Sequence, residues 1–563
     1  MAALGDMDGD GVVDMAVGVY RDDDGGVSAG AVYTLFLNSD GTTKNAQKMS
    51  NLYGNFNTFY SVDADDRFGM SRASLGDLDG DGVVDLAVGA FGDDDGSFNA
   101  GAAYVVSLAQ TYCVTPSPTT TPLACNSDGI AGDAQKLSFL YGSVSAFYTL
   151  EAGDAFGVSV AAIGDLDGDG VGDLVVGANE DDDGGSNTGS VYVFFLGTDG
   201  TVISAQKLSM LYGNFNSFYT LAADDRFGLT ILPLGDVDSD GVADLAVGAG
   251  LDDDGGSIAG AAYILFLKTD GTVMNAQKLS ALYGNFNAFY TLIANDLFGR
   301  SVAAPGDLDG DSVVDMAVGA VYDTDGGSLA GAVYLLFLET DGTCKSVQKM
   351  SNLHGSFNTY YTLAASDHFG VSMTSLEDLN GDSVIDLAVG AYQDDDGGTD
   401  AGAACILFLE TNGTVKDAQK LSNTYGSFNS HYTLSTGVLF GSGVAALGDI
   451  NGDGVVDMAV GVYHDDDGGA SAGAVYTLFL NSDGTIKNAQ KMSNLYGNFN
   501  TFYSVDADDR FGMSLASLGD LDGDNVIELA VGTFLDDDGG TDAGAAYIVN
   551  LQQTYCETPS PTT

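Results

Sequence analysis

The sequence contains no tryptophan, only four histidines, and 18 lysines and arginines against 80 aspartates and glutamates. The shortage of basic residues excludes binding to nucleic-acid backbones and to anionic membrane surfaces, because both depend on Lys and Arg. No run of about 18 apolar residues occurs, so we expect no direct membrane insertion, and any secretion signal is expected outside this sequence. The histidines fall at different places in the repeat described below, and no recurring acid, base or nucleophile set emerges. We therefore expect a protein that is not an enzyme.

Glycine and hydrophobic residues are abundant instead. The 79 glycines accompany a hydrophobic fraction of 45%, which is enough for a packed core. An acidic segment recurs eight times at steps of 71 residues, except for one step of 88 residues. The longer step contains a Pro/Thr-rich stretch at 113–125, which is typical of a stiff, extended linker.

Each repeat is predicted to hold four strands and no helix. In the unit from 441 to 512, a small-residue segment at 443–447 and a short apolar run at 455–460 flank the acidic segment. A nearly continuous apolar run at 474–480 and a polar segment at 489–493 follow. Four-stranded repeats are typical of propeller blades, so the sequence predicts an all-β fold, a β-propeller of 71-residue blades. A solenoid is the alternative.

The two ends of the chain predict a domain organisation. Residues 1–118 nearly duplicate residues 444–561, which indicates a larger unit of six blades plus a linker. We therefore predict four segments: two C-terminal blades of a truncated propeller at 1–112, a Pro/Thr-rich linker at 113–127, a complete six-bladed propeller at 128–552, and the start of the next linker at 553–563. In this scheme the outer strand at 133–138 pairs with the strand at 545–551 and removes the open sheet edges.

The recurring acidic segment predicts a cation site. In the copy that starts at Asp165, carboxylates stand at positions 1, 3, 5 and 9, glycine stands at position 6, and the carbonyl of position 7 is free to point inward. Two carboxylates about 4 Å apart repel by about 4 kcal/mol at an effective dielectric constant of 20, so the loop is expected to need a hard cation. An all-oxygen, flexible set of ligands favours Ca2+ over Mg2+ and lacks the His or Cys that zinc prefers.

Each of the eight acidic loops supplies four side chains and the carbonyl of position 7 as predicted Ca2+ ligands. They are Asp6, Asp8, Asp10, Val12 and Asp14; Asp77, Asp79, Asp81, Val83 and Asp85; Asp165, Asp167, Asp169, Val171 and Asp173; Asp236, Asp238, Asp240, Val242 and Asp244; Asp307, Asp309, Asp311, Val313 and Asp315; Asp378, Asn380, Asp382, Val384 and Asp386; Asp449, Asn451, Asp453, Val455 and Asp457; and Asp520, Asp522, Asp524, Val526 and Glu528.

The copies are not equivalent. Asn380 and Asn451 keep an oxygen ligand at position 3 but lose its charge, and Ser312 and Ser383 replace the glycine that permits a positive φ. The loop at 378–386 has lost both the carboxylate and the glycine. We therefore predict that it binds Ca2+ most weakly.

The acidic loops occur in a wider motif that resembles a known family. Phe440-Gly441 followed by the segment 448–461 (GDINGDGVVDMAVG) resembles the FG-GAP repeat of the integrin α-subunit β-propeller. The Phe-Gly pair also precedes the acidic loop at 68, 156, 227, 298, 369 and 511. The resemblance implies that the loop joins the first two strands of a blade and binds Ca2+ on the lower face, while ligands meet the opposite face.

A second acidic series follows the second predicted strand. Asp triplets begin at 22, 93, 181, 252, 394, 465 and 536, and Asp323 and Asp325 flank a threonine in the remaining copy. These loops are expected on the face opposite the Ca2+ loops, where a solvated turn or a ligand-binding rim would explain them. Aromatic residues of the blade connections either pack between blades or join this rim. The predicted ligand face consists of Asp181, Asp182, Asp183, Asp252, Asp253, Asp254, Tyr219 and Tyr290.

These observations predict a Ca2+-stabilised propeller that acts as an extracellular or cell-surface adhesion or protein-interaction module. Its partner would be a protein or glycan ligand on the face opposite the Ca2+ loops. A polysaccharide-binding module and a non-catalytic accessory domain of a larger secreted hydrolase are the alternatives. Cys113 and Cys125 bracket the linker and would close a small loop in an oxidising compartment.

Overall fold

The fold is taken from a computed structural model of the whole chain. The structure describes residues 202–451 without a break and, around them, 150–151, 153–197, 453–467, 469–493 and 495–496. Outside this part it describes 2–5, 14–19, 28–37, 43–50, 66–68, 71–76, 85–90, 92, 102–108, 131–138, 147–148, 507, 510–512, 514–517, 528–533 and 545–550.

The described strands form antiparallel sheets, seven with four strands and one with three. The first two sheets are β1 (Ala2–Gly5), β2 (Asp14–Val19), β3 (Ala31–Leu37) and β4 (Thr43–Met49), then β5 (Ser71–Gly76), β6 (Asp85–Ala90), β7 (Ala102–Leu108) and β8 (Ala131–Ser138). The next two are β9 (Phe156–Gly164), β10 (Asp173–Ala178), β11 (Ser190–Leu196) and β12 (Val202–Leu208), then β13 (Thr230–Gly235), β14 (Asp244–Ala249), β15 (Ala261–Leu267) and β16 (Val273–Leu279).

The remaining sheets follow in chain order. They are β17 (Phe298–Gly306), β18 (Asp315–Ala320), β19 (Ala332–Leu338) and β20 (Cys344–Met350); β21 (Met373–Ser375), β22 (Leu387–Ala391), β23 (Ala403–Leu409) and β24 (Val415–Leu421); β25 (Val444–Gly448), β26 (Asp457–Val462), β27 (Ala474–Leu480) and β28 (Ile486–Met492); and β29 (Ser514–Ser517), β30 (Glu528–Thr533) and β31 (Ala545–Asn550). The all-β prediction with four-stranded repeats is confirmed for these residues.

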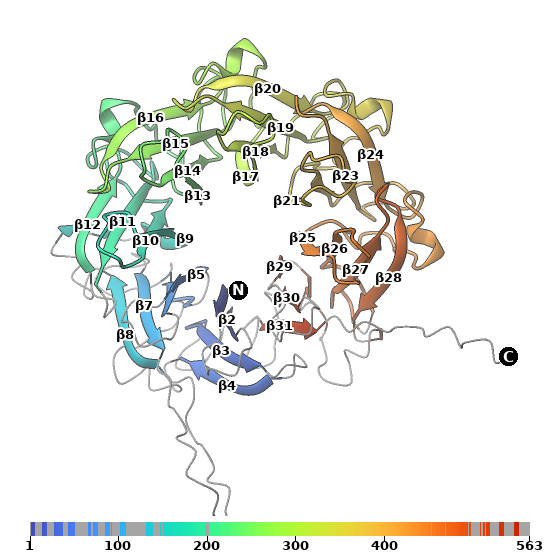
Figure 1. Cartoon of the computed structure of the whole chain (residues 1–563), viewed down its shortest axis with the longest axis horizontal. Coiled ribbons are helices and arrows are strands. Elements are labelled where there is room, and N and C mark those ends of the chain that lie inside the picture. The colour runs from blue at the N-terminus through green and yellow to red at the C-terminus, as the bar shows by residue number, and fades with distance from the viewer. Residues whose placement is uncertain are drawn as a thin grey trace, which may run out of the picture.

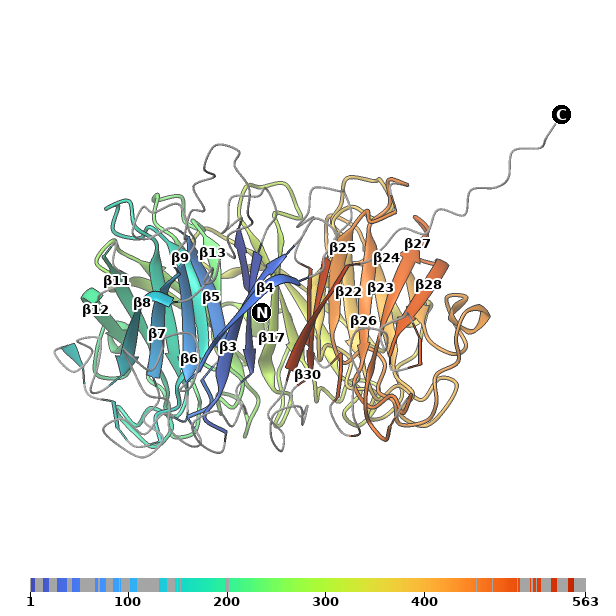
Figure 2. The ribbon, with the colours of Figure 1, turned by 90° about the horizontal axis from the view of Figure 1, so that it is seen from below.

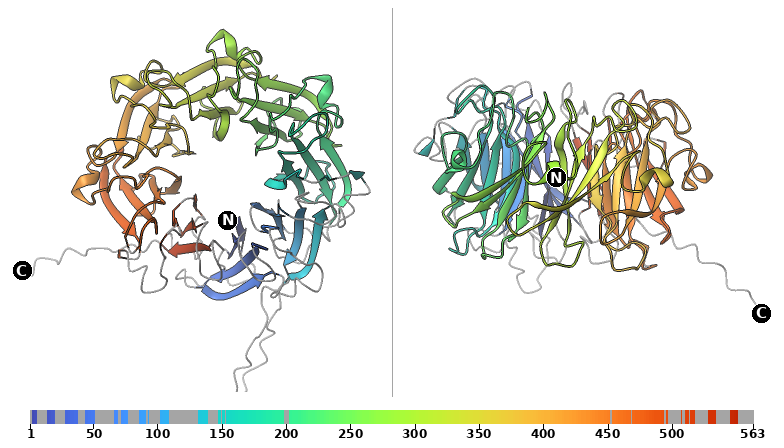
Figure 3. Two further views of the ribbon diagram at one scale, coloured as in Figure 1. Left: turned by 180° about the vertical axis from the view of Figure 1, so that it is seen from behind. Right: turned by 90° about the horizontal axis from the view of Figure 1, so that it is seen from above.

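The sheets stand side by side around a ring, as propeller blades do (Figure 1). The first strands of neighbouring sheets contact one another near the centre, for example β5 with β9 and β25 with β29, and β2 contacts β31. Figures 2 and 3 show the strands running between the two faces of the ring. Successive loops within one sheet therefore alternate between the faces.

The core lies between neighbouring sheets. Every residue of the third strands β11 and β15 is buried. Val191, Val193 and Phe195 of β11 share one cluster with Tyr263 and Leu265 of β15. Because side chains alternate along a strand, each third strand feeds one such layer on either side. The bulky third strands thus pack between sheets, as their apolar sequence predicts.

The Phe-Gly pair holds each connection against the sheet that precedes it. Phe298 forms a parallel bridge to Gly260, and its amide donates to the Ala259 carbonyl at 3.1 Å. Gly260 has φ +85°, and a Cβ there would lie 2.1 Å from the Phe298 carbonyl oxygen. Only glycine fits this crossing, which recurs at Gly189, Gly331, Gly402 and Gly473.

The connections also cover the outer edges of the sheets. Four described connections each contain one turn of 3-10 helix: η2 (Phe215–Ser217), η3 (Phe286–Ala288), η4 (Phe357–Thr359) and η5 (Phe428–Ser430). The Val273 amide at the start of β16 donates to the Gly213 carbonyl at 3.0 Å, and the Asn214 side chain donates to the Val273 carbonyl at 3.1 Å. This covering blocks further strand pairing at an exposed edge.

One expected strand pairing is wrong. Ala131–Ser138 (β8) pairs with Ala102–Leu108 (β7), across the predicted linker, and not with the strand at 545–551. The register explains the choice, because Tyr104 faces Lys136 just as Tyr192 faces Lys207 in the β9–β12 sheet. The segment therefore supplies the outer strand that the β5–β7 sheet lacks before the linker. The division at 1–112, 113–127, 128–552 and 553–563, like the number of blades, stays a prediction.

Candidate metal centre and the opposite acidic face

Each described acidic loop joins the first and second strands of a sheet and curls around its leading carboxylate. Asp165 accepts hydrogen bonds from the amides of Gly168 at 2.7 Å, Asp169 at 3.0 Å and Gly170 at 2.9 Å. Gly170 has φ +94°, as the turn at position 6 requires. The Val171 amide donates to Asp169 at 2.8 Å. The backbone amides thus hold the loop in the tight form that its sequence predicts.

Carboxylate oxygens converge in three of these loops. Ligand atoms within 4.8 Å of one another come from Asp165, Asp167 and Asp173, from Asp236, Asp238 and Asp244, and from Asp307, Asp309 and Asp311. In the first two sets, the carboxylates at positions 1 and 3 are exposed or half-buried, whereas the carboxylate at position 9 is buried. Such a set of hard oxygen donors fits Ca2+, which takes six to eight oxygen ligands in flexible geometry.

The aspartate at position 9 also ties the loop to the sheet. Asp173 is 1% exposed and accepts from the amides of Leu166 at 2.9 Å and Leu196, in the third strand, at 3.2 Å. Burial raises the pKa of Asp173 to about 6, and it raises the pKa of the equivalent Asp244, Asp315, Asp386 and Asp457 to about 7. A nearby cation would favour the ionised form of these groups.

The loops of the next three sheets differ in the predicted way. Ser312 and Ser383 adopt φ +73° and +70°, the strained conformation expected where serine replaces glycine. Asn451 donates its side-chain amide to Asp457 at 2.9 Å, and Asn380 donates to Asp386 at 3.3 Å. Their oxygens are therefore available as ligands, in place of the missing carboxylates.

A lysine that the sequence reasoning overlooked reaches each of these three loops from the start of the outer strand. Lys345 Nζ lies 2.6 Å from both Asp309 and Asp311. Lys416 contacts Asp382, and Lys487 contacts Asp453. The remaining acidic loops, at 6–14, 77–85 and 520–528, lie outside the described residues, apart from the backbone at Asp14, Asp85 and Glu528. Their ligand role stays a prediction.

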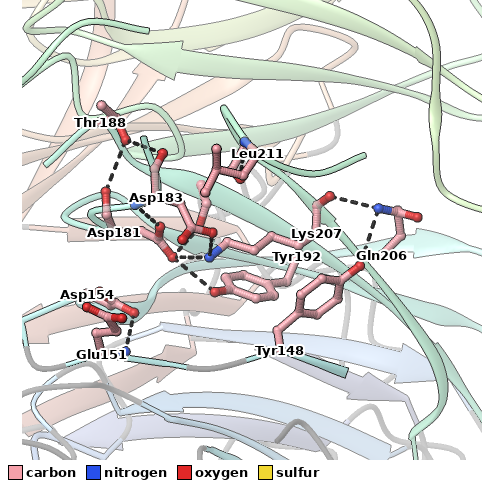
Figure 4. A network of polar contacts seen from close by, with 12 residues as sticks. Tyr148, Glu151, Asp154, Asp181, Asp183, Thr188, Tyr192, Gln206, Lys207 and Leu211 are labelled. Atoms are coloured by element: carbon pink, nitrogen blue, oxygen red, sulfur yellow. Dashed lines mark hydrogen bonds and ion pairs between the residues drawn. The ribbon is translucent and has the colours of Figure 1, made fainter. Parts of the chain in front are cut away.

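On the opposite face, the acidic triplets surround a buried lysine (Figure 4). Lys207, from the end of β12, is 2% exposed, with its Nζ 2.6 Å from Asp181 Oδ2 and in contact with Asp183. The Tyr192 hydroxyl donates to the same Asp181 oxygen at 3.0 Å. The middle residue, Asp182, is exposed and accepts from the Asn187 amide at 2.7 Å.

The same network recurs around the described ring. Buried lysines contact the first and third acidic residues in the pairs Lys278 with Asp252 and Asp254, Lys349 with Asp323 and Asp325, Lys420 with Asp394 and Asp396, and Lys491 with Asp465 and Asp467. Of the predicted ligand face, only Asp182 and Asp253 are exposed. The signal that could have found this network is the lysine that recurs in every Ala-Gln-Lys or Val-Gln-Lys segment.

The two tyrosines predicted for the ligand face take part in packing. Tyr219 lies edge-on to Tyr263 and Tyr283, with centroid distances of 5.8 and 5.2 Å, and its hydroxyl accepts from Gln277 at 3.3 Å. Tyr290 lies edge-on to Tyr334 at 5.7 Å. Both are half-buried. A polar pocket of about 430 Å³ opens beside Tyr432, the equivalent tyrosine in the connection that leads into the β25–β28 sheet. His431, Asp466 and Tyr496 also line this pocket.

Two of the cysteines lie among the described residues. Cys344 and Cys405 are buried free thiols, and burial raises the pKa of each to about 12. Cys405 takes the place that Tyr192 has in β11. Cys113 and Cys125 lie outside the described residues.

Comparison with known proteins adds the family. The FG-GAP repeat family matches residues 150–194 and 293–337. Integrin alpha pat-2 of Caenorhabditis elegans is 29% identical over 46% of this chain, and integrin alpha-PS2 of Drosophila melanogaster is 31% identical over 41%. The chain covers 19% and 15% of these two relatives.

A solved structure of BBS1N in complex with ARL6DN aligns with 85% of this chain and 90% of its own, at a TM-score of 0.37 and 11% identity. Among the described residues, no helix is both long and apolar enough to cross a membrane. The recurring Phe-Gly crossing and acidic loop, together with these relatives, identify the chain as an FG-GAP repeat protein that is distantly related to integrin α subunits.

Proposed function

We propose that the protein is a Ca2+-binding propeller that acts as an extracellular adhesion or protein-interaction module. The observation that carries the metal part is the convergence of three carboxylates in each of three loops of the same type. The relationship to integrin α subunits supports the adhesion part and a place at the cell surface. Extracellular calcium modules bind with dissociation constants of about 10⁻⁴ to 10⁻³ M, which also fits that location.

Calcium would neutralise loops that otherwise repel themselves. Two carboxylates about 4 Å apart repel by about 4 kcal/mol at an effective dielectric constant of 20, and each loop holds several such pairs. Because Asp173 and its equivalents link the loop to the third strand, this repulsion acts on the sheet as well as on the loop. Metal binding is thus expected to stabilise the folded protein.

The test is thermal unfolding and calorimetric titration of the full chain. We expect the melting temperature to rise by several degrees between chelator and about 5 mM Ca2+, since ligand at many times its dissociation constant stabilises by more than about 1 kcal/mol. Mg2+ at the same concentration is expected to stabilise less. Equal melting temperatures in chelator and Ca2+, with no heat of binding, would refute the metal part.

We also propose that sheets from both sides of the predicted linker share one ring. The pairing of β7 with β8 and the contact of β2 with β31 support this arrangement. Small-angle X-ray scattering of the full chain would test it. A single compact ring is expected, and two separate bodies would contradict the proposal and support the six-bladed unit at 128–552.

A polysaccharide-binding role is a second candidate because of the pocket beside β28. Tyr432 and Tyr496 offer ring surfaces next to the exposed carboxylate of Asp466, a combination that suits sugar hydroxyls. Binding to a glycan array that is lost in Tyr496→Ala would favour this role. Binding to cell-surface proteins that survives the same substitution would favour the adhesion role.

A further inference from the structure

The lysines at the start of the outer strands divide the acidic loops into two groups. Lys345, Lys416 and Lys487 occupy the second position of β20, β24 and β28. The same position holds Ile203 in β12 and Met274 in β16, and both side chains are exposed, at 61% and 39%. Five equivalent positions thus differ in one feature, the presence of a tethered cation.

The geometry of the loops follows this division. Without lysine, the clustered carboxylates are those of positions 1, 3 and 9. In the loop that Lys345 reaches, they are Asp307, Asp309 and Asp311, at positions 1, 3 and 5, and the lysine nitrogen lies 2.6 Å from two of them. The ammonium group therefore lies against two of the three clustered carboxylates, and this cluster differs from that of the loops without lysine.

The number of carboxylates changes in the same direction. The loops at 165–173 and 236–244 each have four carboxylates and no lysine, and the loop at 307–315 has four carboxylates and one lysine. The loops at 378–386 and 449–457 have three carboxylates, an asparagine and one lysine. The affinity of oxygen-ligand sites for Ca2+ depends on the number of charged ligands, so both changes should weaken binding.

We infer that Lys345, Lys416 and Lys487 are built-in competitors of Ca2+, so that the loops at 165–173 and 236–244 are the tight sites of the described ring. This inference rests on the proposed metal function. The three lysines are 36%, 42% and 49% exposed, so their ion pairs are of the solvent-screened kind that contributes little to stability. Calcium can therefore displace the ammonium groups at higher concentration, and the three loops become low-affinity sites.

The consequence is a graded response to calcium. At low concentration only the tight loops fill, while the lysine-bearing loops hold their shape through the tethered ammonium group. At higher concentration these loops release the lysines into solvent and bind the metal. One face of the ring would then gain positive charge from the metal, while the ammonium groups, which keep their charge, become exposed to solvent.

Calorimetric Ca2+ titration of the full chain tests this inference with a triple variant, Lys345→Met, Lys416→Met and Lys487→Met. Methionine is chosen because Met274 occupies the equivalent position of β16 in the wild-type protein. Because the ammonium group no longer competes for the carboxylates, we expect up to about fivefold tighter Ca2+ binding at each of the three loops, the factor that corresponds to an exposed ion pair of about 1 kcal/mol. The three weak sites should therefore fill at lower Ca2+ concentrations than in the wild type, with the wild-type tight sites unchanged.

A matched control and a reciprocal variant complete the test. Lys268, in the turn after β15, is exposed and forms no ion pair with an acidic loop in the part of the chain that the structure describes. Lys268→Met should therefore leave the titration unchanged. Met274→Lys should remove one tight site. In chelator, the triple variant should melt at a lower temperature than the wild type, and in saturating Ca2+ this difference should shrink.

The outcomes separate the two proposals. If no variant binds Ca2+, both the metal function and this inference are overturned. If the wild type binds Ca2+ but the weak sites of the triple variant bind it no more tightly than those of the wild type or of Lys268→Met, the inference alone is wrong.

Discussion

Replacing Asp296 by asparagine should stabilise the protein above neutral pH and leave it nearly unchanged in acid. Asp296 is 1% exposed and lies in the connection that enters β17. Its Oδ2 accepts from the Ile293 amide at 2.7 Å, but its Oδ1 is buried without a donor. Asp296 lies beside the acidic triplet loop that starts at Asp323, because the backbone amide of Tyr322 donates to the Asp296 carbonyl at 3.2 Å.

The charges around Asp296 explain the expected pH dependence. Asp323 already receives the Lys349 ammonium at 2.7 Å and the Tyr334 hydroxyl at 2.9 Å, and Asp325 contacts the same lysine. Burial first, and then the charges of Asp323 and Asp325, raise the pKa of Asp296 from 3.8 to about 7, although Lys349 and the Ile293 amide oppose the shift. The folded protein therefore holds a proton that the unfolded chain releases.

The sign and size follow from linkage. The pKa of Asp296 is higher in the folded protein than in the unfolded chain. The free energy of unfolding is therefore highest below about pH 4, where Asp296 is protonated in both states, and it falls as the pH rises towards about 7. One pKa unit corresponds to about 1.4 kcal/mol, so the loss is at most about 4 kcal/mol at pH 8. An asparagine in this place would mimic the protonated acid at every pH.

Urea unfolding of the full chain at pH 5 and pH 8, in chelator, measures this effect. We expect Asp296→Asn to raise the free energy of unfolding by about 1–4 kcal/mol at pH 8, and by clearly less at pH 5. Asp417→Asn, which changes an exposed aspartate in β24, should show no such difference. An equal effect of Asp296→Asn at the two pH values would refute the reasoning.

Three further changes test other parts of the fold. Lys349→Met leaves Asp323 buried without its cation and should cost about 3–5 kcal/mol in urea unfolding, whereas Lys268→Met at an exposed site should cost less than about 1 kcal/mol. Gly260→Ala should lower the free energy of unfolding by about 2–4 kcal/mol, because the new Cβ would clash with the backbone of Phe298. Gly437→Ala should cost less, because Gly437 also has a positive φ, +78°, but has open space around it, so that only backbone strain remains. Removing residues 1–127 should lower the melting temperature of the rest, because β8 loses β7 and β31 loses β2; an unchanged melting temperature would support an independent unit at 128–552.

The sequence alone was sufficient for the parts of the structure that repeat locally. The acidic loop, its glycine at position 6 and the apolar third strand each lie within a few residues, and each takes the predicted form, as Gly170 and β15 show. The strained serines at 312 and 383 were predictable for the same reason. Periodicity carries this information because one repeat is one sheet.

Long-range partners were harder to predict. The pairing of Tyr192 with Lys207 across β11 and β12 places the lysine beside Asp181, 26 residues earlier in the chain. Asp181 therefore reads as a surface residue in the sequence but is buried in the structure. The pairing of β7 with β8 across the Pro/Thr-rich segment escaped prediction because the 71-residue period is broken there.

The two faces of the ring neutralise their carboxylates in different ways, and this difference limits where a metal can matter. The triplet face uses buried lysines and tyrosine hydroxyls from the same sheet, as Lys278 and Tyr263 at Asp252 show, so the chain itself supplies the cations there. The acidic-loop face has exposed or half-buried carboxylates at positions 1 and 3, and only some of the described loops receive a lysine, which is itself exposed. Changes in calcium should therefore act on one face. Changes in pH near neutrality should act on both: on the triplet face through Asp225, Asp296 and Asp367, and on the acidic-loop face through the buried position-9 aspartates, since burial raises the pKa of each of these groups to about 6 or 7. A partner that binds the triplet face would then respond to calcium only through the strands that join the faces.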